Sequence, residues 1–440
     1  MARLFGTDGV RGLANGEVLT PELALAVAGS AASVLLEQGT PRPCVAVGRD
    51  PRPSGQMLEA AAVAGFTAAG CDVLLLGVVP TPAVAHATAG AAAQLGLMIS
   101  ASHNAMPDNG LKLFGDGGWK LPDEVEDAVQ AGLGQPRRVT GAAVGRVVDG
   151  GADARARYAA HLLEVARTPL AGLKVVLNCA QGAASALAPE VYRRAGAEVV
   201  AIHADGDGER INEGCGATHL ESLQAAVVEH GAALGLAHDG DADRCLAVDA
   251  TGAVVDGDQL LALLAVGLHE RGELTGDTVV ATVMSNLGFV RAMGAAGIEV
   301  VQTAVGDRYV LEAMRERGLA LGGEQSGHTV QLARATTGDG LLTGLAVLDR
   351  VAASGRSLAE LAAVMTRLPQ VLVNVRADRA RASDPEVLAA VAAQEAALGD
   401  TGRVLLRPSG TEALVRVMVE ADSEQRARAV ADVLAGVVGG

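Results

Sequence analysis

Aromatic residues are scarce in this chain of 440 residues: Phe, Tyr and Trp together make up 2%. Hydrophobic residues still account for 50% of the sequence, so Ala, Val and Leu must build its cores. A chain of this length is expected to form two to four domains at roughly 100–200 residues each. Each such domain is long enough to bury a core of its own.

Cysteines spaced as in a zinc site or a disulfide framework are also missing. The five cysteines are an odd number, lie far apart and form no C-x-x-C motif. This pattern favours a reducing compartment, the cytoplasm. The sequence has no apolar signal segment at its start and no uncharged apolar run of about 18 residues, so we expect no membrane span.

Positive charge is in short supply. The chain has 35 Lys and Arg against 51 Asp and Glu, a formal net charge of −16. Nucleic acids and anionic membrane surfaces both require basic patches, so neither is an expected partner. An anionic substrate would need Arg and Lys gathered locally, against the charge of the whole chain.

Three similar units make up most of the chain. Each opens with a β-branched strand, continues into a helical pattern, and adds a second strand that begins at Gly and then a third strand. The strands of the successive units fall at 44–50, 70–77 and 95–104, at 174–180, 196–204 and 234–243, and at 278–284, 297–305 and 319–328. Strands that alternate with helices predict mostly parallel α/β sheets, so we expect three similar α/β domains.

The pattern changes at about Leu368. A strand at 370–377 and a helix over 384–398 are followed by two strands around a turn over 402–421 and a final helix over 423–438, which predicts a smaller α+β domain. The predicted domains are 1–150, 151–252, 253–367 and 368–440. The candidate linkers are the Gly-rich segment 141–152, the hairpin-like 249–257 and the stretch around Pro369.

The third strand of each unit runs into a polar cluster. These clusters are "SASHN" (100–104), "HDGDADR" (238–244) and "GGEQSGH" (322–328). In open α/β sheets, ligands bind beyond the carboxyl ends of the strands. The matching positions therefore predict that three loops contribute to one shared site; the alternative is three ordinary polar loops.

The cluster "HDGDADR" (238–244) contains Asp239, Asp241 and Asp243 at alternate positions. Three converging carboxylates suit a hard cation, Mg²⁺ or Ca²⁺. An EF-hand is excluded because Arg244 stands where its loop needs Gly and Ala250 where it needs Glu. The alternative is a solvated acidic turn.

A second candidate site is "RPSGTEALVR" (407–416). Arg407, Ser409, Gly410, Thr411 and Arg416 surround a turn between two strands. Backbone N–H groups, hydroxyls and guanidinium groups together form a phosphate cradle. The alternative is an exposed hairpin with incidental arginines.

The remaining two clusters offer a carboxylate and hydroxyls. Glu324 and Ser326 suit the hydroxyl groups or an amine of a sugar, and His328 is either a ligand contact or a structural histidine. Ser102 beside His103 is reminiscent of a hydrolase, but the G-x-S-x-G elbow of such enzymes is absent. A serine nucleophile, a metal site, a phosphate cradle and a sugar loop are together the parts of a phosphoryl-transfer enzyme.

The motifs resemble the α-D-phosphohexomutase superfamily over essentially the whole chain. The motifs are "GTDGVRG" (6–12), "ISASHN" with "DNGLK" (99–112), "DGDADR", "GGEQSGH" and "RPSGTE". "GGEQSGH", "MSNLG" (284–288) and "GDRYV" (306–310) resemble its glucosamine branch, the bacterial phosphoglucosamine mutases. The fold this implies is three similar mixed-sheet α/β domains and a smaller C-terminal α+β domain around a central cleft.

The resemblance also implies residue roles. Ser102 is the phosphoserine, and one Mg²⁺ per subunit is held by Asp239, Asp241, Asp243 and a phosphate oxygen on Ser102. The acid/base candidates are Lys112, whose pKa nearby cations would have to lower, and His103. Arg11 and Arg244 would add positive charge, and Glu324 and Ser326 would contact the sugar. The non-reacting phosphate would be bound by Arg407, Ser409, Gly410, Thr411 and Arg416. His328 is a further catalytic candidate.

The implied reaction interconverts glucosamine 6-phosphate and glucosamine 1-phosphate. It uses a 1,6-bisphosphate of glucosamine or glucose as activator and leads toward UDP-N-acetylglucosamine and cell-wall precursors. The expected partners are small sugar phosphates, and a homodimer is left open. The rival hypotheses are a phosphomannomutase or phosphoglucomutase, a non-catalytic sugar-phosphate-binding protein, and a metal-dependent phosphatase that uses "DGDAD".

Overall fold

The structure, a computed structural model, describes residues 3–6, 8–37, 39–40, 42–90, 93–135, 137–408 and 414–440. The chain separates into two compact units. The first comprises Met1–Val283 and Ile298–Ala362, and the second comprises Met284–Gly297 and Ala363–Gly440. In the described residues, we find no helix that combines the length and apolar character needed to cross a membrane.

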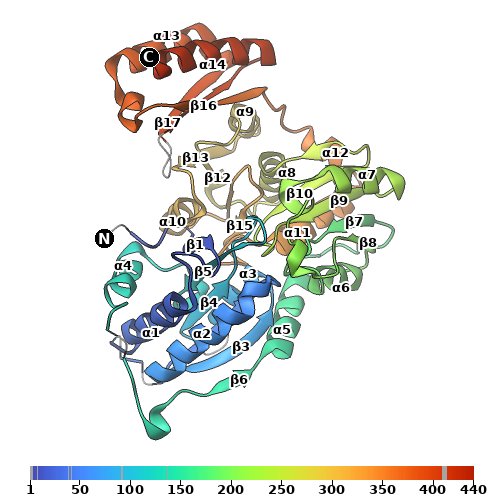
Figure 1. Ribbon diagram of the computed structural model, residues 1–440. Helices are drawn as coiled ribbons and strands as arrows, with labels where there is room; N and C mark the ends of the chain where they lie inside the picture. Colours follow the sequence, from blue (N-terminus) through green and yellow to red (C-terminus); the bar gives the residue numbers. More distant parts are fainter. Residues whose placement is uncertain are drawn as a thin grey trace. The chain divides into compact units, whose positions relative to one another are not determined.

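The first sheet of the first unit has the strand order β1-β5-β4-β2-β3-β6. β2, β3, β4 and β6 are parallel, whereas β5 runs antiparallel to both β4 and β1. α1 (Pro21–Glu37) and α2 (Pro53–Ala69) pack side by side along this sheet (Figure 1). The strands are β1 (Val10–Leu13), β2 (Cys44–Arg49), β3 (Asp72–Val78), β4 (Leu95–Ile99), β5 (Asp108–Phe114) and β6 (Val147–Asp149).

Two further sheets lie in the first unit, with the orders β11-β10-β9-β7-β8 and β13-β12-β14-β15. The strands of the former are β7 (Lys174–Asn178), β8 (Glu198–Ile202), β9 (Leu234–His238), β10 (Cys245–Asp249) and β11 (Val254–Val255). The strands of the latter are β12 (Thr278–Thr282), β13 (Glu299–Thr303), β14 (Leu321–Gly323) and β15 (Thr329–Gln331).

These three sheets share one topology. In each, the first strand of the repeat pairs in parallel with the second and the third strands, and the third strand turns into an antiparallel hairpin partner. Each predicted polar cluster occupies the hairpin loop that follows the third strand. The threefold repeat predicted from the sequence and its mixed-sheet α/β fold are therefore confirmed.

A glycine at the same place in each third strand explains part of this repetition. A Cβ atom on Gly96 would lie 2.4 Å from Thr88 Oγ1, on Gly235 2.6 Å from Val227 Cγ2, and on Gly322 2.6 Å from Met314 Sδ. Thr88, Val227 and Met314 lie on α3 (Thr81–Gly90), α7 (Glu221–Glu229) and α10 (Asp307–Arg317), respectively. Each glycine thus lets a helix pack directly on the third strand, which fixes the strand whose end carries the polar loop.

The helices of the first unit connect and cover these strands (Figure 1). They are α1 (Pro21–Glu37), α2 (Pro53–Ala69), α3 (Thr81–Gly90), α4 (Asp123–Ala131), α5 (Gly151–Leu163), α6 (Leu187–Arg194), α7 (Glu221–Glu229), α8 (Gly257–Glu270), α10 (Asp307–Arg317), α11 (Gly340–Ser354) and α12 (Leu358–Ala362).

The second unit contains a sheet of order β16-β18-β17, antiparallel throughout. α13 and α14 pack on one face of it (Figure 1), and Val and Ala side chains fill the space between. Its elements are α9 (Leu287–Ala295), β16 (Gln370–Arg376), α13 (Pro385–Leu398), β17 (Arg403–Pro408), β18 (Leu414–Glu420) and α14 (Glu424–Gly439).

Two features differ from the predicted organisation. Candidate linkers 141–152 and 249–257 contain paired strands, β6 and β11, so part of each segment belongs to a sheet. Segment 284–297 packs with the C-terminal residues rather than with the third repeat: the backbone N of Leu287 donates a 2.8 Å hydrogen bond to Oε2 of the buried Glu420. The four predicted domain boundaries stay a prediction.

Candidate active site

The serine loop begins where β4 ends and runs to β5. Ser102 is 1% exposed and has a φ of +53°, a left-handed conformation that costs energy in a residue other than glycine. Its hydroxyl donates a 2.6 Å hydrogen bond to Oδ2 of Asp239, and Nδ1 of His103 lies 3.2 Å from Oγ of Ser102. The predicted nucleophile therefore contacts the acidic loop directly.

The acidic loop joins β9 to β10 and carries Asp239, Asp241 and Asp243. One carboxylate oxygen from each lies within 4.8 Å of the other two, and all three residues are buried. Oδ1 of Asp241 and Oδ1 of Asp243 are buried without a hydrogen-bond partner among the described residues. Hard cations such as Mg²⁺ bind such oxygens, so the residues present fit an ion of this kind.

The charges in this loop are only partly balanced by the protein. Burial and the neighbouring charges of Asp243 and Asp241 raise the pKa of Asp239 well above its ordinary value. Burial also acts to raise the pKa of Asp241, but the ammonium group of Lys112 outweighs it and lowers that pKa. A divalent cation would supply positive charge that the cluster lacks.

Lys112, on β5, reaches into the same cluster. Its Nζ lies 2.8 Å from Oδ2 of Asp241, 3.0 Å from Oδ2 of Asp8 and 3.4 Å from Oδ2 of Asp243. Burial favours the neutral amine, but these three carboxylates outweigh it and raise the pKa of Lys112. The expectation that nearby cations lower this pKa is therefore wrong for this arrangement, because the nearest charges are negative. A role in proton transfer stays a prediction.

Two arginines border the cluster. Arg11, on β1, pairs with Asp8 and donates a 3.5 Å hydrogen bond to the carbonyl of Ala101. Nε of Arg244 lies 3.9 Å from Oδ1 of Asp243. Burial and the charges of Arg244 and Arg11 lower the pKa of His103 to about 4. The imidazole is therefore neutral near pH 7 and able to accept a proton.

The sugar loop is the turn between β14 and β15. Oε1 of Glu324 accepts a 3.2 Å hydrogen bond from the backbone N of Gly306, whereas the buried Oγ of Ser326 has no partner in the described part of the chain. His328 is 3% exposed, with Nε2 3.3 Å from Oδ2 of Asp307 but outside hydrogen-bond geometry. Both alternatives for His328, ligand contact and structural histidine, stay open.

Backbone contacts join the sugar loop to the acidic loop. Arg244 and His328 form an antiparallel bridge, and the backbone N of Cys245 donates a 3.0 Å hydrogen bond to the carbonyl of Gly327. The serine, acidic and sugar loops therefore meet within the first unit, as their matching positions predicted. The catalytic and binding roles of their residues remain predictions.

The phosphate cradle belongs to the second unit, and part of it can be described. Arg407 on β17 and Arg416 on β18 are direct cross-strand partners. Partial burial and the charge of Arg416 lower the pKa of Arg407. Two adjacent guanidinium groups are costly without an anion between them, which fits a phosphate site. Ser409, Gly410 and Thr411 lie outside the described residues.

Arg52, a residue not predicted from the sequence, holds the serine loop in place. Arg52 is fully buried at the start of α2, with Nε 2.9 Å from Oδ2 of Asp50. Its guanidinium group donates hydrogen bonds to backbone carbonyls of the serine loop and the start of β5, those of Ser102, Asn104, Ala105 and Asp108. The signal was available: Asp50 and Arg52 follow the first strand of a repeat, next to a predicted polar loop.

Other missed residues link separate parts of the site. Nδ2 of Asn212 donates hydrogen bonds to the carbonyls of Ser102, at 2.9 Å, and Asn104, at 3.0 Å. Asp8 forms ion pairs with both Lys112 and Lys120, and Lys120 also pairs with Asp307 of "GDRYV". No local pattern in the sequence marks these pairs, because each joins residues more than 90 positions apart.

Family models match nearly the whole chain. They describe the phosphoglucomutase/phosphomannomutase α/β/α domain I over residues 2–137, domain II over 156–252, domain III over 256–368 and the C-terminal domain over 372–437. A phosphoglucosamine mutase of Saccharopolyspora erythraea is 65% identical over 100% of this chain and 99% of its own length. The chain belongs to the phosphoglucomutase/phosphomannomutase family, part of the α-D-phosphohexomutase superfamily.

Other phosphohexomutases agree with this assignment. A phosphoglucosamine mutase of Frankia casuarinae is 64% identical over 100% of this chain and 98% of its own. A family protein of Burkholderia thailandensis has a crystal structure that superposes with a TM-score of 0.83 at 23% identity, covering 99% of this chain and 97% of that one. The fold is therefore that of the phosphohexomutases, and the relatives make this chain an isomerase.

Proposed function

We propose that this phosphohexomutase interconverts glucosamine 6-phosphate and glucosamine 1-phosphate through phosphorylated Ser102 and a 1,6-bisphosphate intermediate. The observation that carries the proposal is the position of the Ser102 hydroxyl, buried and 2.6 Å from Asp239. A serine beside a hard-cation site and a lysine meets the needs of phosphoryl transfer. The names of the two relatives above support glucosamine as the sugar.

The proposed metal is one Mg²⁺ per subunit. Asp239, Asp241 and Asp243 would hold it, with a phosphate oxygen on Ser102 as a further ligand. When bound, the ion supplies positive charge that stabilises the transferring phosphoryl group. The unpartnered Oδ1 atoms of Asp241 and Asp243 support this assignment.

The first half-reaction transfers the phosphoryl group to the sugar. The 1-hydroxyl oxygen of glucosamine 6-phosphate attacks the phosphorus on Ser102, and the bond from phosphorus to Oγ breaks. The hydroxyl proton moves to a base, for which His103 and Lys112 are the candidates. The neutral imidazole of His103 favours it as the acceptor, and the charged Lys112 then stabilises the phosphoryl oxygens. Arg11 and Arg244 add positive charge at the same place.

The second half-reaction returns a phosphoryl group to the enzyme. The bisphosphate turns over and Oγ of Ser102 attacks the phosphorus on O6. The bond from phosphorus to O6 breaks, and the proton held by the base moves to O6, leaving glucosamine 1-phosphate. A dephosphorylated Ser102 has no group to donate, so glucosamine or glucose 1,6-bisphosphate acts as an activator. The product would supply UDP-N-acetylglucosamine and cell-wall precursor synthesis in the cytoplasm.

Substrate binding is divided between two groups of residues in this proposal. Glu324, Ser326 and His328 bind the sugar, and the unpartnered hydroxyl of Ser326 is suited to a ligand hydrogen bond. The non-reacting phosphate is assigned to the residues of the cradle, Arg407, Ser409, Gly410, Thr411 and Arg416. Because the cradle accepts the phosphate at either end of the substrate, the same residues serve both half-reactions.

Phosphorus NMR of the purified protein with Mg²⁺ tests the proposal. The panel comprises the 6-phosphates of glucosamine, glucose and mannose, each with and without a 1,6-bisphosphate. We expect glucosamine phosphate to be interconverted fastest. A preference for glucose or mannose phosphate would keep the reaction type but contradict the sugar assignment. No exchange of any substrate, even with activator, would contradict the proposal and favour a binding protein.

A further inference from the structure

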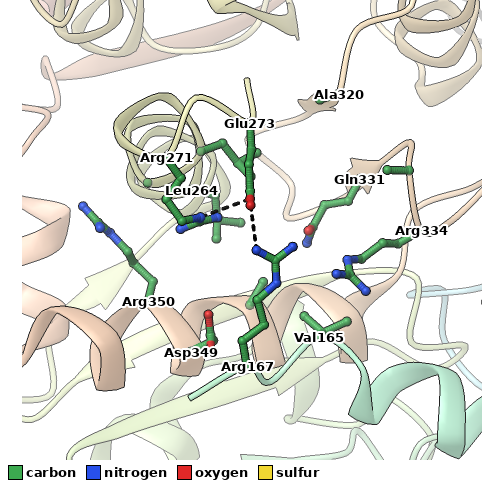
Figure 2. A pocket seen from close by; sticks show the side chains of 14 residues that line it. Val165, Arg167, Leu264, Arg271, Glu273, Ala320, Gln331, Arg334, Asp349 and Arg350 are labelled. Carbon is green, nitrogen blue, oxygen red and sulfur yellow. Dashed lines mark hydrogen bonds and ion pairs between the residues drawn. The ribbon is translucent and has the colours of Figure 1, made fainter. Parts of the chain in front are cut away.

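A cavity of about 550 Å³ lies in the first unit and shares no lining residue with the serine, acidic or sugar loops (Figure 2). Segments of α8 and α11, the segment after α5 and the residues around β15 line it. Its charged lining residues are Arg167, Arg271, Arg334, Arg350, Glu273 and Asp349. In a chain with a net charge of −16, this local excess of arginine creates a field that attracts anions.

The two carboxylates that line the cavity, those of Glu273 and Asp349, already have partners within the protein. Glu273 serves two guanidinium groups at once, with Oε1 2.6 Å from Arg167 Nη1 and Oε2 3.0 Å from Arg271 Nε (Figure 2). Oδ1 of Asp349 accepts a 2.7 Å hydrogen bond from the backbone N of Thr168. Both acidic side chains of the lining are therefore already engaged.

Three side chains point toward the same part of the cavity, Arg167, Gln331 and Arg334 (Figure 2). Nε2 of Gln331 is buried without a hydrogen-bond partner, which is costly unless a ligand or water accepts from it. Arg334 forms no ion pair with any residue in the described part of the chain. Donors without acceptors thus gather at one side of the cavity.

We propose that this cavity binds a small anionic metabolite that carries phosphate or carboxylate groups. Arg334 and Arg167 are its guanidinium donors, and Gln331 is its amide donor. The planar guanidinium group forms paired, charge-assisted hydrogen bonds with either kind of anion. The volume lies within the range of small-molecule sites. The proposal concerns a site apart from Ser102 and does not rest on the proposed mutase function.

The cavity lies at the base of the hairpin whose tip is the sugar loop. Ala320 and Gln331 line the cavity, and Gln331 is the register partner of Leu321 at the open end of the β14–β15 hairpin. α11 lines it as well, and the first residue of that helix, Gly340, donates a 3.0 Å hydrogen bond to the carbonyl of Ala242 in the acidic loop. A bound anion would therefore contact two elements that also carry the active site.

Isothermal titration calorimetry tests the proposal with two probes, inorganic pyrophosphate and citrate. The proteins compared are the full-length parent chain, Arg334→Gln and Gln331→Ala. The matched control is Arg194→Ala, which removes a half-exposed arginine of α6 that pairs with Glu190. We expect at least one probe to bind the parent and the control with the same Kd. In each cavity variant, the Kd of that probe should rise about tenfold or more, which corresponds to a loss of ~1.4 kcal/mol of binding free energy. The tighter probe identifies the anionic group.

Two results would overturn the proposal. One is the absence of saturable binding of either probe to the parent at millimolar concentration. The other is an unchanged Kd in Arg334→Gln and Gln331→Ala, which would place any binding at the phosphate-binding groups of the active site. Melting temperatures confirm that the variants are folded. Mutase activity without probe is expected to be unchanged in Arg334→Gln, so failure of this proposal is distinguishable from failure of the proposed function.

Discussion

The hydroxyl oxygen of Ser102 lies 2.6 Å from Oδ2 of Asp239, although 137 positions separate the two residues in the sequence. The two belong to hairpin loops at equivalent positions in two different sheets. Repetition of one α/β unit has therefore placed a serine hydroxyl, the proposed nucleophile, on one copy and a cluster of carboxylates on another. The contact between them is the structural basis for assigning phosphoryl transfer to this chain.

Ser102→Ala is expected to lower mutase activity more than about 1,000-fold, because it removes the hydroxyl proposed to carry the phosphoryl group. Steady-state kinetics with glucosamine 6-phosphate and a bisphosphate activator measure this loss. The melting temperature of the variant should stay within a few degrees of the parent value. Activity close to that of the parent would contradict a phosphoserine at this position.

Removal of divalent metal by EDTA is expected to abolish activity, and Mg²⁺ should restore it. Mg²⁺ should also raise the melting temperature of the metal-free protein, because it offsets the repulsion among three buried carboxylates. Asp241→Asn should weaken both effects of Mg²⁺. Differential scanning fluorimetry gives a readout that is independent of catalysis. A melting temperature that does not respond to Mg²⁺ in the parent would argue against a metal site in the acidic loop.

Arg52→Lys is expected to lower kcat about tenfold or more while changing KM little. Lysine keeps a positive charge beside Asp50 but cannot bind four carbonyls at once, so Ser102 would be less well oriented while the sugar and phosphate contacts remain. The matched control is Arg381→Lys, which alters another arginine bonded to backbone carbonyls, those of Val437 and Val438. Equal losses of kcat in both variants would show a general effect on stability instead.

Arg416→Ala is expected to raise the KM for sugar phosphate about tenfold or more, with a smaller effect on kcat. The reason is that the phosphate held by the cradle does not react, so its contacts stabilise ground state and transition state alike. Arg376→Ala, which removes an exposed arginine from the neighbouring strand β16, is the control. A large fall in kcat at unchanged KM would contradict this division of roles.

Asp339→Asn is expected to flatten the pH dependence of stability. Burial raises the pKa of Asp339 to about 6, despite its hydrogen bonds with Leu342 N and Tyr158. A raised carboxyl pKa means that the folded state holds the proton more tightly. The free energy of unfolding therefore falls as the pH rises from about 4 to about 6, by up to about 3 kcal/mol. Asparagine can accept the same hydrogen bonds but cannot ionise.

Urea midpoints of the parent and Asp339→Asn at pH values across this window measure the effect. The urea midpoint of Asp339→Asn should rise relative to that of the parent as the pH increases. The exposed capping residue Asp378 provides the control, Asp378→Asn, whose difference from the parent should stay small. A constant difference between parent and Asp339→Asn would contradict the shifted pKa.

Local signals in the sequence were sufficient to predict the repeats and the loops of the site. β-branched runs such as 44–50 and 174–180 correspond to β2 and β7, and the polar clusters occur at the ends of β4, β9 and β14. The alternation of Asp239, Asp241 and Asp243 was enough to predict that the three carboxylates converge. The prediction was possible because all three residues belong to one short loop.

Long-range contacts could not be predicted in the same way. The anchoring of the serine loop by Arg52 and the pairing of Asp8 with Lys112 depend on how distant segments pack, and no local spacing encodes them. The raised pKa of Lys112 has the same origin, because it depends on carboxylates more than 100 positions away. The strand β6 inside a Gly-rich segment was missed because it spans only three residues, and its pairing with β3 is a long-range contact.

Peptide mass spectrometry of the parent chain after incubation with Mg²⁺ and glucosamine 1,6-bisphosphate tests directly whether Ser102 carries the phosphoryl group. We expect one phosphoryl group, located on Ser102 and lost again when glucosamine 6-phosphate is added in excess. Phosphorylation of Ser100 instead, or full mutase activity in a protein that carries no phosphoserine, would contradict it.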